Sequence, residues 1–142
     1  MTRTTKTTLE FPYSRTVGPV VGAFLAGLRE HRILGVRNRD GRVFVPPLEY
    51  DPHTGEALEE LVEVGPAGTV ESWTWVPEPT PKHPLAHSFA FALIRPDNAD
   101  TAMIHVVDAG TVERMSTGMR VRPRWRPDPH HMIDDLEAWE PV

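Results

Sequence analysis

The sequence contains no cysteine. This absence excludes disulfide bonds, thiolate nucleophiles and the cysteine sets that hold most structural zinc ions. Basic residues are also in the minority, 15 against 20 acidic ones, and the net charge of −5 argues against general affinity for nucleic acid. The longest apolar run, residues 17–28, is too short to span a bilayer, and the threonine-rich start of the chain lacks an apolar signal segment. We therefore expect a cytoplasmic protein with no membrane partner.

Proline and glycine are abundant. Fifteen prolines and ten glycines in 142 residues predict many turns and few long helices, within one domain or one domain with a small appendage. One helix is expected within residues 16–34, after a flexible arm at residues 1–15. Thr16 would cap this helix, and Pro19 lies in its first turn, where a missing N–H costs nothing. Its last turn is expected to reach about Arg32.

Two tight-turn sequences follow in residues 35–58. The first is Asn38-Arg39-Asp40-Gly41 and the second is Asp51-Pro52-His53-Thr54-Gly55, with a short apolar run between them. Glycine tolerates the positive φ that such turns require. Two turns about a dozen residues apart are the skeleton of a zinc ribbon, in which each turn carries a Cys-x-x-Cys pair. The sequence therefore predicts a degenerate, cysteine-free zinc-ribbon-like segment.

Residues 59–142 change to the two-residue period of β-strands. Strands are expected at residues 61–64, 68–76, 89–94, 102–107, 119–125 and 132–139. In the longest one, alternation places Val70 and Thr74 on one face and Trp73 and Trp75 on the other. Five or six short strands of this kind predict a small closed OB-fold β-barrel. The fold class is thus mainly β, with a helix and the ribbon-like segment preceding the barrel.

The order of several motifs resembles a known family. GRVFVPP is followed by DPHTG, then by VGPAGTVESWTWV, and then by STGMRVRPRW. These motifs are similar to the acyl-CoA-associated family called domain of unknown function thirty-five, a rubredoxin-like zinc ribbon fused to an OB-fold. The resemblance covers residues 22–139, and the opening FPYSRTVGPVVGAFLAGLREHRILGV resembles a subgroup associated with steroid degradation.

The resemblance implies a zinc site that this chain cannot complete. The four cysteine positions of the family fall here on Arg37, Asp40, Asp51 and Thr54. Arginine cannot ligate zinc and threonine is a poor ligand, so we predict no zinc and no other cofactor. We expect the turns, the packing of Phe44 and an ion pair from Arg37 to Asp40 or Asp51 to hold the segment instead.

The resemblance also implies a function. Members of the family resemble accessory subunits of thiolase-like enzymes or of MaoC-type enoyl-CoA hydratases, and the steroid-associated subgroup pairs with a thiolase-fold aldolase. The prediction is a non-catalytic subunit in a hetero-oligomer with a lipid-transfer-protein-type aldolase, which performs retro-aldol cleavage of a steroid side-chain acyl-CoA, as in cholesterol catabolism. A CoA ester would be the substrate of the complex, and the hydratase partner is the alternative. The expected docking residues are Phe11, Tyr13, Phe24, Leu28, Phe44 and Tyr50.

A row of arginines stands out in residues 119–126. On a strand, Arg120, Arg122, Arg124 and Arg126 share one face. Arginine matches phosphate oxygens, so the first three are candidates for binding the phosphates of coenzyme A. The alternative is a cross-strand ladder with the acidic C-terminal segment, whose carboxylates are Asp134, Asp135, Glu137 and Glu140.

A second class of function is a stand-alone OB module that binds single-stranded nucleic acid. Trp73 and Trp75 on one strand face would supply a stacking platform for bases. Glu71 shares that face and the chain is acidic, which argues against this reading. The histidines of the proline loop, His83 and His87, and the pair His130-His131 are read as surface residues in preference to metal ligands. Alternation separates His105 from Asp108, so this pair is not expected to form a catalytic dyad.

Overall fold

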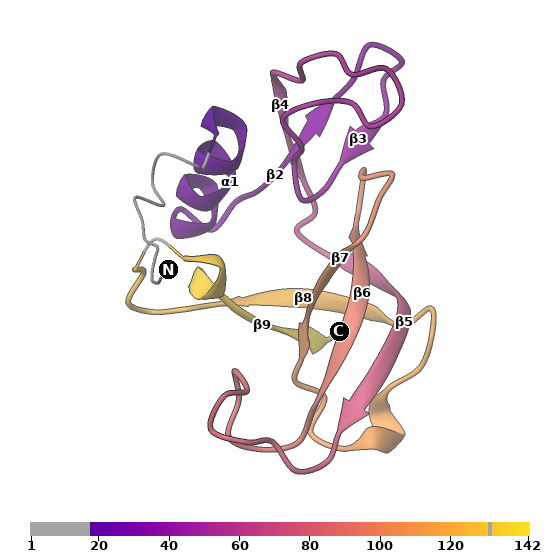
Figure 1. Ribbon diagram of the computed structural model, residues 1–142. Coiled ribbons are helices and arrows are strands. Elements are labelled where there is room, and N and C mark those ends of the chain that lie inside the picture. Colours follow the sequence, from indigo (N-terminus) through magenta and orange to yellow (C-terminus); the bar gives the residue numbers. More distant parts are fainter. Residues whose placement is uncertain (1–17, 131) are drawn as a thin grey trace, which may run out of the picture.

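The computed structural model describes residues 18–130 and 132–142 (Figure 1). Four predicted features, namely the arm at residues 1–15, the cap Thr16 and the docking residues Phe11 and Tyr13, lie outside the described residues. Among the described residues, no helix is long and apolar enough to cross a membrane.

Helix α1 (Pro19–Arg29) begins after Gly18, and Pro19 occupies its first position, where no hydrogen bond is lost. Its buried residues Val20, Phe24, Gly27 and Leu28 recur at three- and four-residue steps. The chain leaves the helix through His31, which adopts a positive φ of 65°. The helix is therefore shorter than the predicted range 16–34, because Ile33 and Leu34 already belong to the next strand.

A three-stranded antiparallel sheet follows, with the order β3-β2-β4, and we call it the N-terminal sheet. It consists of β2 (Ile33–Arg37), β3 (Val43–Phe44) and β4 (Glu60–Val64). Ile33 pairs with Val64 and Arg37 with Glu60 along its main ladder. The predicted boundary at residue 59 assigns β4 to the barrel. That assignment is wrong, because β4 forms its ladder with β2 in the N-terminal sheet.

The remaining strands close into a five-stranded barrel with the order β5-β6-β7-β9-β8. The predicted class, mainly β with an N-terminal helix and an OB-fold, is confirmed. The strands are β5 (Gly68–Val76), β6 (Phe89–Pro96), β7 (Met103–Val107), β8 (Arg120–Trp125) and β9 (Leu136–Pro141), and two short 3₁₀ turns, η2 (Val112–Arg114) and η3 (Ile133–Asp135), connect them. A single residue pair between β7 and β9, Val107 with Trp139, closes the barrel.

A bulge in β5 changes which side chains face the core. The register shifts between Val70 and Ser72, so the alternation restarts after Val70. Val70 is fully buried, and beyond the bulge Trp73 and Trp75 pack against the core, whereas Ser72 and Thr74 are exposed. The predicted opposition of Val70 to the two tryptophans is therefore wrong, whereas that of Thr74 is confirmed.

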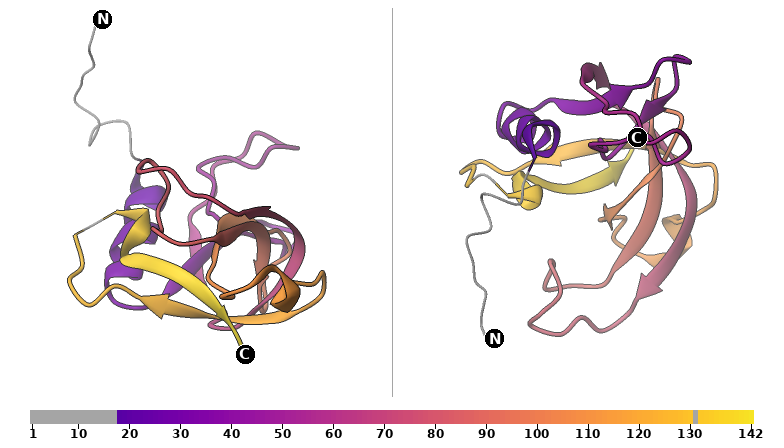
Figure 2. Two further views of the ribbon diagram at one scale, coloured as in Figure 1. Left: turned by 90° about the horizontal axis from the view of Figure 1, so that it is seen from below. Right: turned by 45° about the horizontal axis from the view of Figure 1, so that its top comes forward.

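The helix, the N-terminal sheet and the barrel share one hydrophobic core. It joins Phe24 and Leu28 of α1, Ile33 of β2 and Trp139 of β9. The turn between β6 and β7 is hydrogen-bonded to the N-terminal sheet and the residue that follows β3. Asp100 Oδ2 accepts the N–H of Val43 at 2.8 Å, and the hydroxyl of Thr101 bonds both the N–H and the carbonyl of Val45. On the other side, α1 lies beside η3 (Figure 2), and the ring of His31 stacks on Trp125 of β8 at 5.0 Å.

Candidate functional site

The two turns predicted to be the remains of a zinc site are joined by a hydrogen bond. Asn38 Nδ2 donates to Asp51 Oδ2 at 3.0 Å, and both side chains are buried. Asn38 Oδ1 accepts the N–H groups of Asp40 and Arg42, so this one side chain closes its own turn and reaches the other. Asp51 Oδ1 accepts the N–H groups of His53 and Thr54 in the second turn. The Asn38–Asp51 pair thus spans the position between the turns.

The residues at the four positions where the resemblance implies cysteine ligands do not fit zinc. Arg37 bonds Glu60 across the ladder at 2.6 Å, so the predicted ion pair from Arg37 to Asp40 or Asp51 is wrong. The N–H of His53 and the amide of Asn38 lower the pKa of Asp51, which stays an acceptor with both oxygens engaged. A cationic side chain and a carboxylate with no oxygen to spare do not make a tetrahedral ligand set.

Sequence reasoning missed Asn38 because it is not one of the four family ligand positions. The signal was nevertheless present, since an asparagine three residues before a glycine commonly bonds the backbone of its own turn. The glycines that end the two turns, Gly41 and Gly55, both have a positive φ.

Three of the predicted docking residues are covered by the chain itself. Phe24 and Leu28 lie in the common core, and Phe44 packs in a second buried cluster with Val20 and Val36. Their assignment to a partner interface is therefore wrong. The error arose because an apolar stripe in the sequence does not show whether the same chain or a partner covers it. Tyr50 differs from the other three, with 65% of its surface exposed.

The arginine row forms a ladder of ion pairs. Arg124 bonds Glu137 at 2.7 Å, Asp108 at 2.9 Å and Glu140 at 3.1 Å. Burial opposes its charge, but these carboxylates outweigh that effect and raise the pKa of the Arg124 guanidinium. Arg120 makes two hydrogen bonds to Asp97, and these lower the pKa of that carboxyl.

The other two arginines of the row are engaged more loosely. Arg122 approaches Glu140 at 3.6 Å and is the most exposed of the three candidates for CoA phosphates. Arg126 donates to the backbone carbonyl of Asp128. The geometry favours the structural reading of the row, in which guanidinium groups bond carboxylates of this chain.

Asp108 ties three parts of the barrel together. Besides Arg124, it bonds His87 Nε2 at 2.9 Å, and so connects the proline loop to β7 and β8. Burial alone would raise the pKa of Asp108, but the hydrogen bonds from Arg124 and His87 lower it. Asp108 therefore faces His87 and not His105, in agreement with the expected separation of His105 from Asp108.

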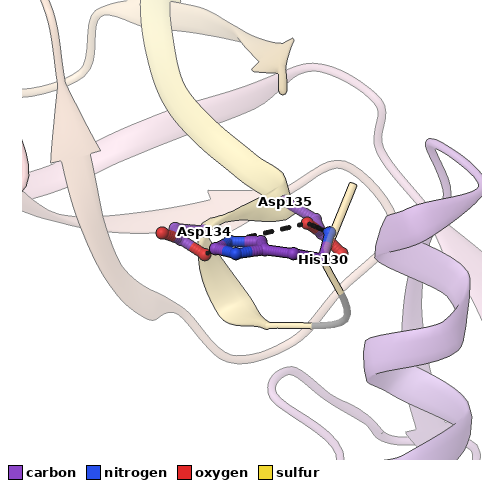
Figure 3. Close-up of side chains that lie close together, drawn as sticks. All are labelled: His130, Asp134 and Asp135. Atoms are coloured by element: carbon purple, nitrogen blue, oxygen red, sulfur yellow. Dashed lines mark hydrogen bonds and ion pairs between the residues drawn. The ribbon is translucent and has the colours of Figure 1, made fainter. Parts of the chain in front are cut away.

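Three side chains near η3 lie close together (Figure 3): His130, Asp134 and Asp135, whose candidate ligand atoms all fall within 4.8 Å of one another. Asp135 Oδ1 accepts the backbone N–H of His130 at 2.7 Å, and His130 Nε2 bonds Asp134. These contacts close the loop between β8 and β9. Internal hydrogen bonds of this kind account for the cluster without an ion.

A feature that sequence reasoning missed is an apolar surface on β6 and β7. Leu93 and Ile104 are cross-strand neighbours, 37% and 70% exposed, and Phe91 and Val106 are the next pair along the same face. Phe91 and Ile104 line two adjoining hollows of about 260 and 200 Å³. The signal was that residues 89–94 are all apolar, whereas a strand with one solvent-facing side alternates between apolar and polar residues.

Comparison with known proteins agrees with this architecture. Residues 61–126 match the family of the C-terminal OB-fold domain of ChsH2. A DUF35-family protein of unknown function from Sulfolobus solfataricus is 25% identical, with a TM-score of 0.68 over 92% of this chain and 88% of that chain. The Ltp2–ChsH2(DUF35) aldolase is 18% identical, with a TM-score of 0.66 over 88% of this chain and 96% of that one. Among curated proteins, none matches this sequence. The resemblance to the domain-of-unknown-function-35 family is confirmed.

Proposed function

We propose that this chain, whose barrel is of the ChsH2 OB-fold type, is a non-catalytic accessory subunit of a thiolase-like aldolase. The complex would cleave a steroid side-chain acyl-CoA by a retro-aldol reaction. The observation that carries the proposal is the shared architecture. The Ltp2–ChsH2(DUF35) aldolase contains a chain of this fold, aligned over nearly its whole length. Its identity to this chain is low, so the fold is the support, and the partner and substrate are the proposal.

The described side chains favour an accessory role over catalysis. His87 and Asp108 have the geometry of a base and its orienting carboxylate, but Asp108 is also committed to Arg124. Neither His87 nor Asp108 lines one of the hollows described above. In the proposed complex, the partner therefore supplies the acid, the base and the residues that hold the CoA ester.

The alternative of a nucleic-acid-binding OB module has little support in the barrel. Trp73 and Trp75 are half-buried against the core and do not form an exposed stacking row. Three arginines of the row, Arg120, Arg122 and Arg124, are paired with carboxylates. A protein surface is thus a better match for this barrel than a phosphate backbone.

Co-expression with a thiolase-like aldolase encoded by the same genome tests the proposal. We expect the two chains to elute together in size-exclusion chromatography. We also expect the pair to release product from a steroid side-chain β-hydroxyacyl-CoA faster than the partner alone. Separate elution, together with full activity of the partner alone, would refute the accessory role. Hydration of an enoyl-CoA without aldol cleavage would favour the hydratase alternative.

A further inference from the structure

The second and third strands of the barrel carry an apolar outer face, which we call the β6–β7 face. Its central residues are Phe91 and Leu93 of β6 and Ile104 and Val106 of β7. In OB-folds this face, with the loops that follow the first and fourth strands, is the usual ligand surface. Here those loops contribute Pro84 and Ile133 to its edge.

Part of the β6–β7 face is already covered by the chain. The proline loop packs Leu85 against a cluster that includes Phe89 and Val106, and His83 meets the rings of Phe89 and Phe91 edge-on. This cover ends before Leu93 and Ile104. Ile104 is the most exposed large apolar side chain among the described residues apart from the terminal Val142. An exposed apolar patch next to covered apolar surface is typical of an interaction site.

The ionised side chains that line the two hollows have one sign, and the cation Arg95, next to Leu93 on the same side of β6, is paired with Glu71. No lysine or arginine lines either hollow, and the only charged lining residues are the carboxylates Asp134 and Glu137. His105 lies at the edge of the second hollow, and burial lowers its pKa, so it adds no positive charge at neutral pH. Both rim carboxylates also have contacts within the chain. Asp134 bonds His130. Glu137 shares Arg124 with Asp108 and Glu140, so that one guanidinium serves three carboxylates. The rim thus keeps an excess of carboxylates, which disfavours phosphate groups and complements a cationic side chain.

The shape of the face limits the occupant further. Each hollow is smaller than the pockets of about 300–1,000 Å³ that usually enclose small molecules. The two hollows adjoin at Phe91 and Ile104, which gives a continuous shallow track across two strands and η3. A track of this kind fits successive apolar side chains of a protein segment.

We infer that the β6–β7 face receives an apolar segment of the partner subunit that carries a lysine or arginine beside its apolar residues. The cationic residue lies against Asp134 and Glu137, and the apolar residues cover Leu93 and Ile104. This inference rests on the proposed function, because the segment belongs to the aldolase partner. It locates a contact on the barrel, whereas the sequence places the docking residues on the helix and the ribbon-like segment.

Binding of the purified thiolase-like partner to variants of the full chain tests the inference. Ile104→Asp is expected to weaken the complex by at least about tenfold, as for a central interface residue. Asp134→Asn is expected to slow association and to flatten its dependence on salt. The matched controls are Val112→Asp and Glu113→Gln, both exposed on η2 away from the β6–β7 face, and their affinities should stay within about twofold of wild type.

The outcomes separate the two proposals. If the wild-type chain forms no complex, the proposed function fails. If the wild-type complex forms and Ile104→Asp, with an unchanged circular dichroism spectrum, binds as tightly, the β6–β7 face is not the contact. Unchanged salt dependence in Asp134→Asn would refute the cationic residue. A labelled oligothymidylate that binds wild type and not Ile104→Asp would also overturn the inference, in favour of nucleic acid.

Discussion

The amide of Asn38 donates a 3.0 Å hydrogen bond to the carboxylate of Asp51 across the gap between the two turns of the N-terminal sheet. In a zinc ribbon the metal holds this gap closed. Here each side chain also accepts two backbone N–H groups of its own turn, so the pair links five polar contacts into one buried network. We expect this side-chain hydrogen bond to serve here the structural role that the ion has in a zinc ribbon.

Replacing Asn38 tests this role. Asn38→Ala removes the bond to Asp51 and leaves buried donors and acceptors without partners. We expect the free energy of unfolding to fall by about 2–3 kcal/mol. Arg37→Ala is the control, because Arg37 is engaged in an exposed ion pair with Glu60, and its loss should cost less than about 1 kcal/mol. Urea unfolding followed by circular dichroism measures both, and equal costs would contradict a central role for Asn38.

The metal content of the purified protein provides a second test. We expect less than stoichiometric zinc by mass spectrometry and no change in melting temperature with a chelator, because Arg37 and Asp51 are engaged elsewhere. A variant with cysteine at positions 37, 40, 51 and 54 should bind one zinc ion tetrahedrally and lose stability when the chelator is added. Stoichiometric zinc in the wild-type chain would contradict the expected absence.

The elements of the fold were predictable where the hydrophobic periodicity and the flanking glycines and prolines indicate the same boundaries. Strand β5 has the predicted bounds. Its side chains follow a two-residue alternation, and the strand is bounded by a Gly-Pro step before it and a proline after it. Its bulge at Val70 was not predictable, because a register shift depends on the facing strand. The same holds for β4, whose apolar pattern fits either sheet.

The dependence of stability on pH should reveal the lowered pKa of the buried His105. Burial lowers the pKa of His105 below its ordinary value of 6.5. Between the lowered value and 6.5, the unfolded chain binds a proton that the folded chain does not, so stability falls as the pH drops through this window. In His105→Phe this early loss should disappear. Stability should then fall only at lower pH, where carboxyls with lowered pKa values, such as Asp51 and Asp97, take up protons.

Urea midpoints of wild type and His105→Phe at several pH values between 7.5 and 4.5 measure the difference. The stability of wild type should fall relative to that of His105→Phe as the pH drops below about 6.5, so the difference between the two curves should change across this range. Parallel curves over the whole range would contradict the assignment of this window to His105.

The arginine ladder gives a prediction about stability. Arg124→Met leaves Asp108, Glu137 and Glu140 close together without their shared cation. We expect a loss of about 1–3 kcal/mol, because the site is only partly buried. Arg122→Met should cost less than about 1 kcal/mol, since its single ion pair is long and exposed. Similar costs for the two variants would show that Arg124 does not organise the ladder.

Coenzyme A binding tests the other reading of the same arginines. Since Arg120 and Arg124 already bond carboxylates, we expect the isolated chain to show no salt-sensitive binding of coenzyme A through this row. Isothermal titration calorimetry at low salt measures it. Binding that is present in wild type and lost in Arg122→Ala would instead establish a phosphate site.

The candidate site was less predictable than the fold. An apolar stripe identifies Phe24, Leu28 and Phe44 as buried, but it does not distinguish a cover made by the same chain from one made by a partner. Exposure of Ile104 depends on where the proline loop stops, which is a matter of tertiary packing. Asn38 was overlooked because the family resemblance directs attention to the ligand positions on either side of it.

The Asn38–Asp51 bond also has a chemical consequence. Zinc–thiolate clusters are lost when peroxides convert their sulfurs to sulfenic acids or disulfides. An amide and a carboxylate undergo no such reaction, and the chain has no sulfur other than that of its five methionines. We therefore expect the closure of the N-terminal sheet to withstand oxidants that would open a cysteine-ligated ribbon.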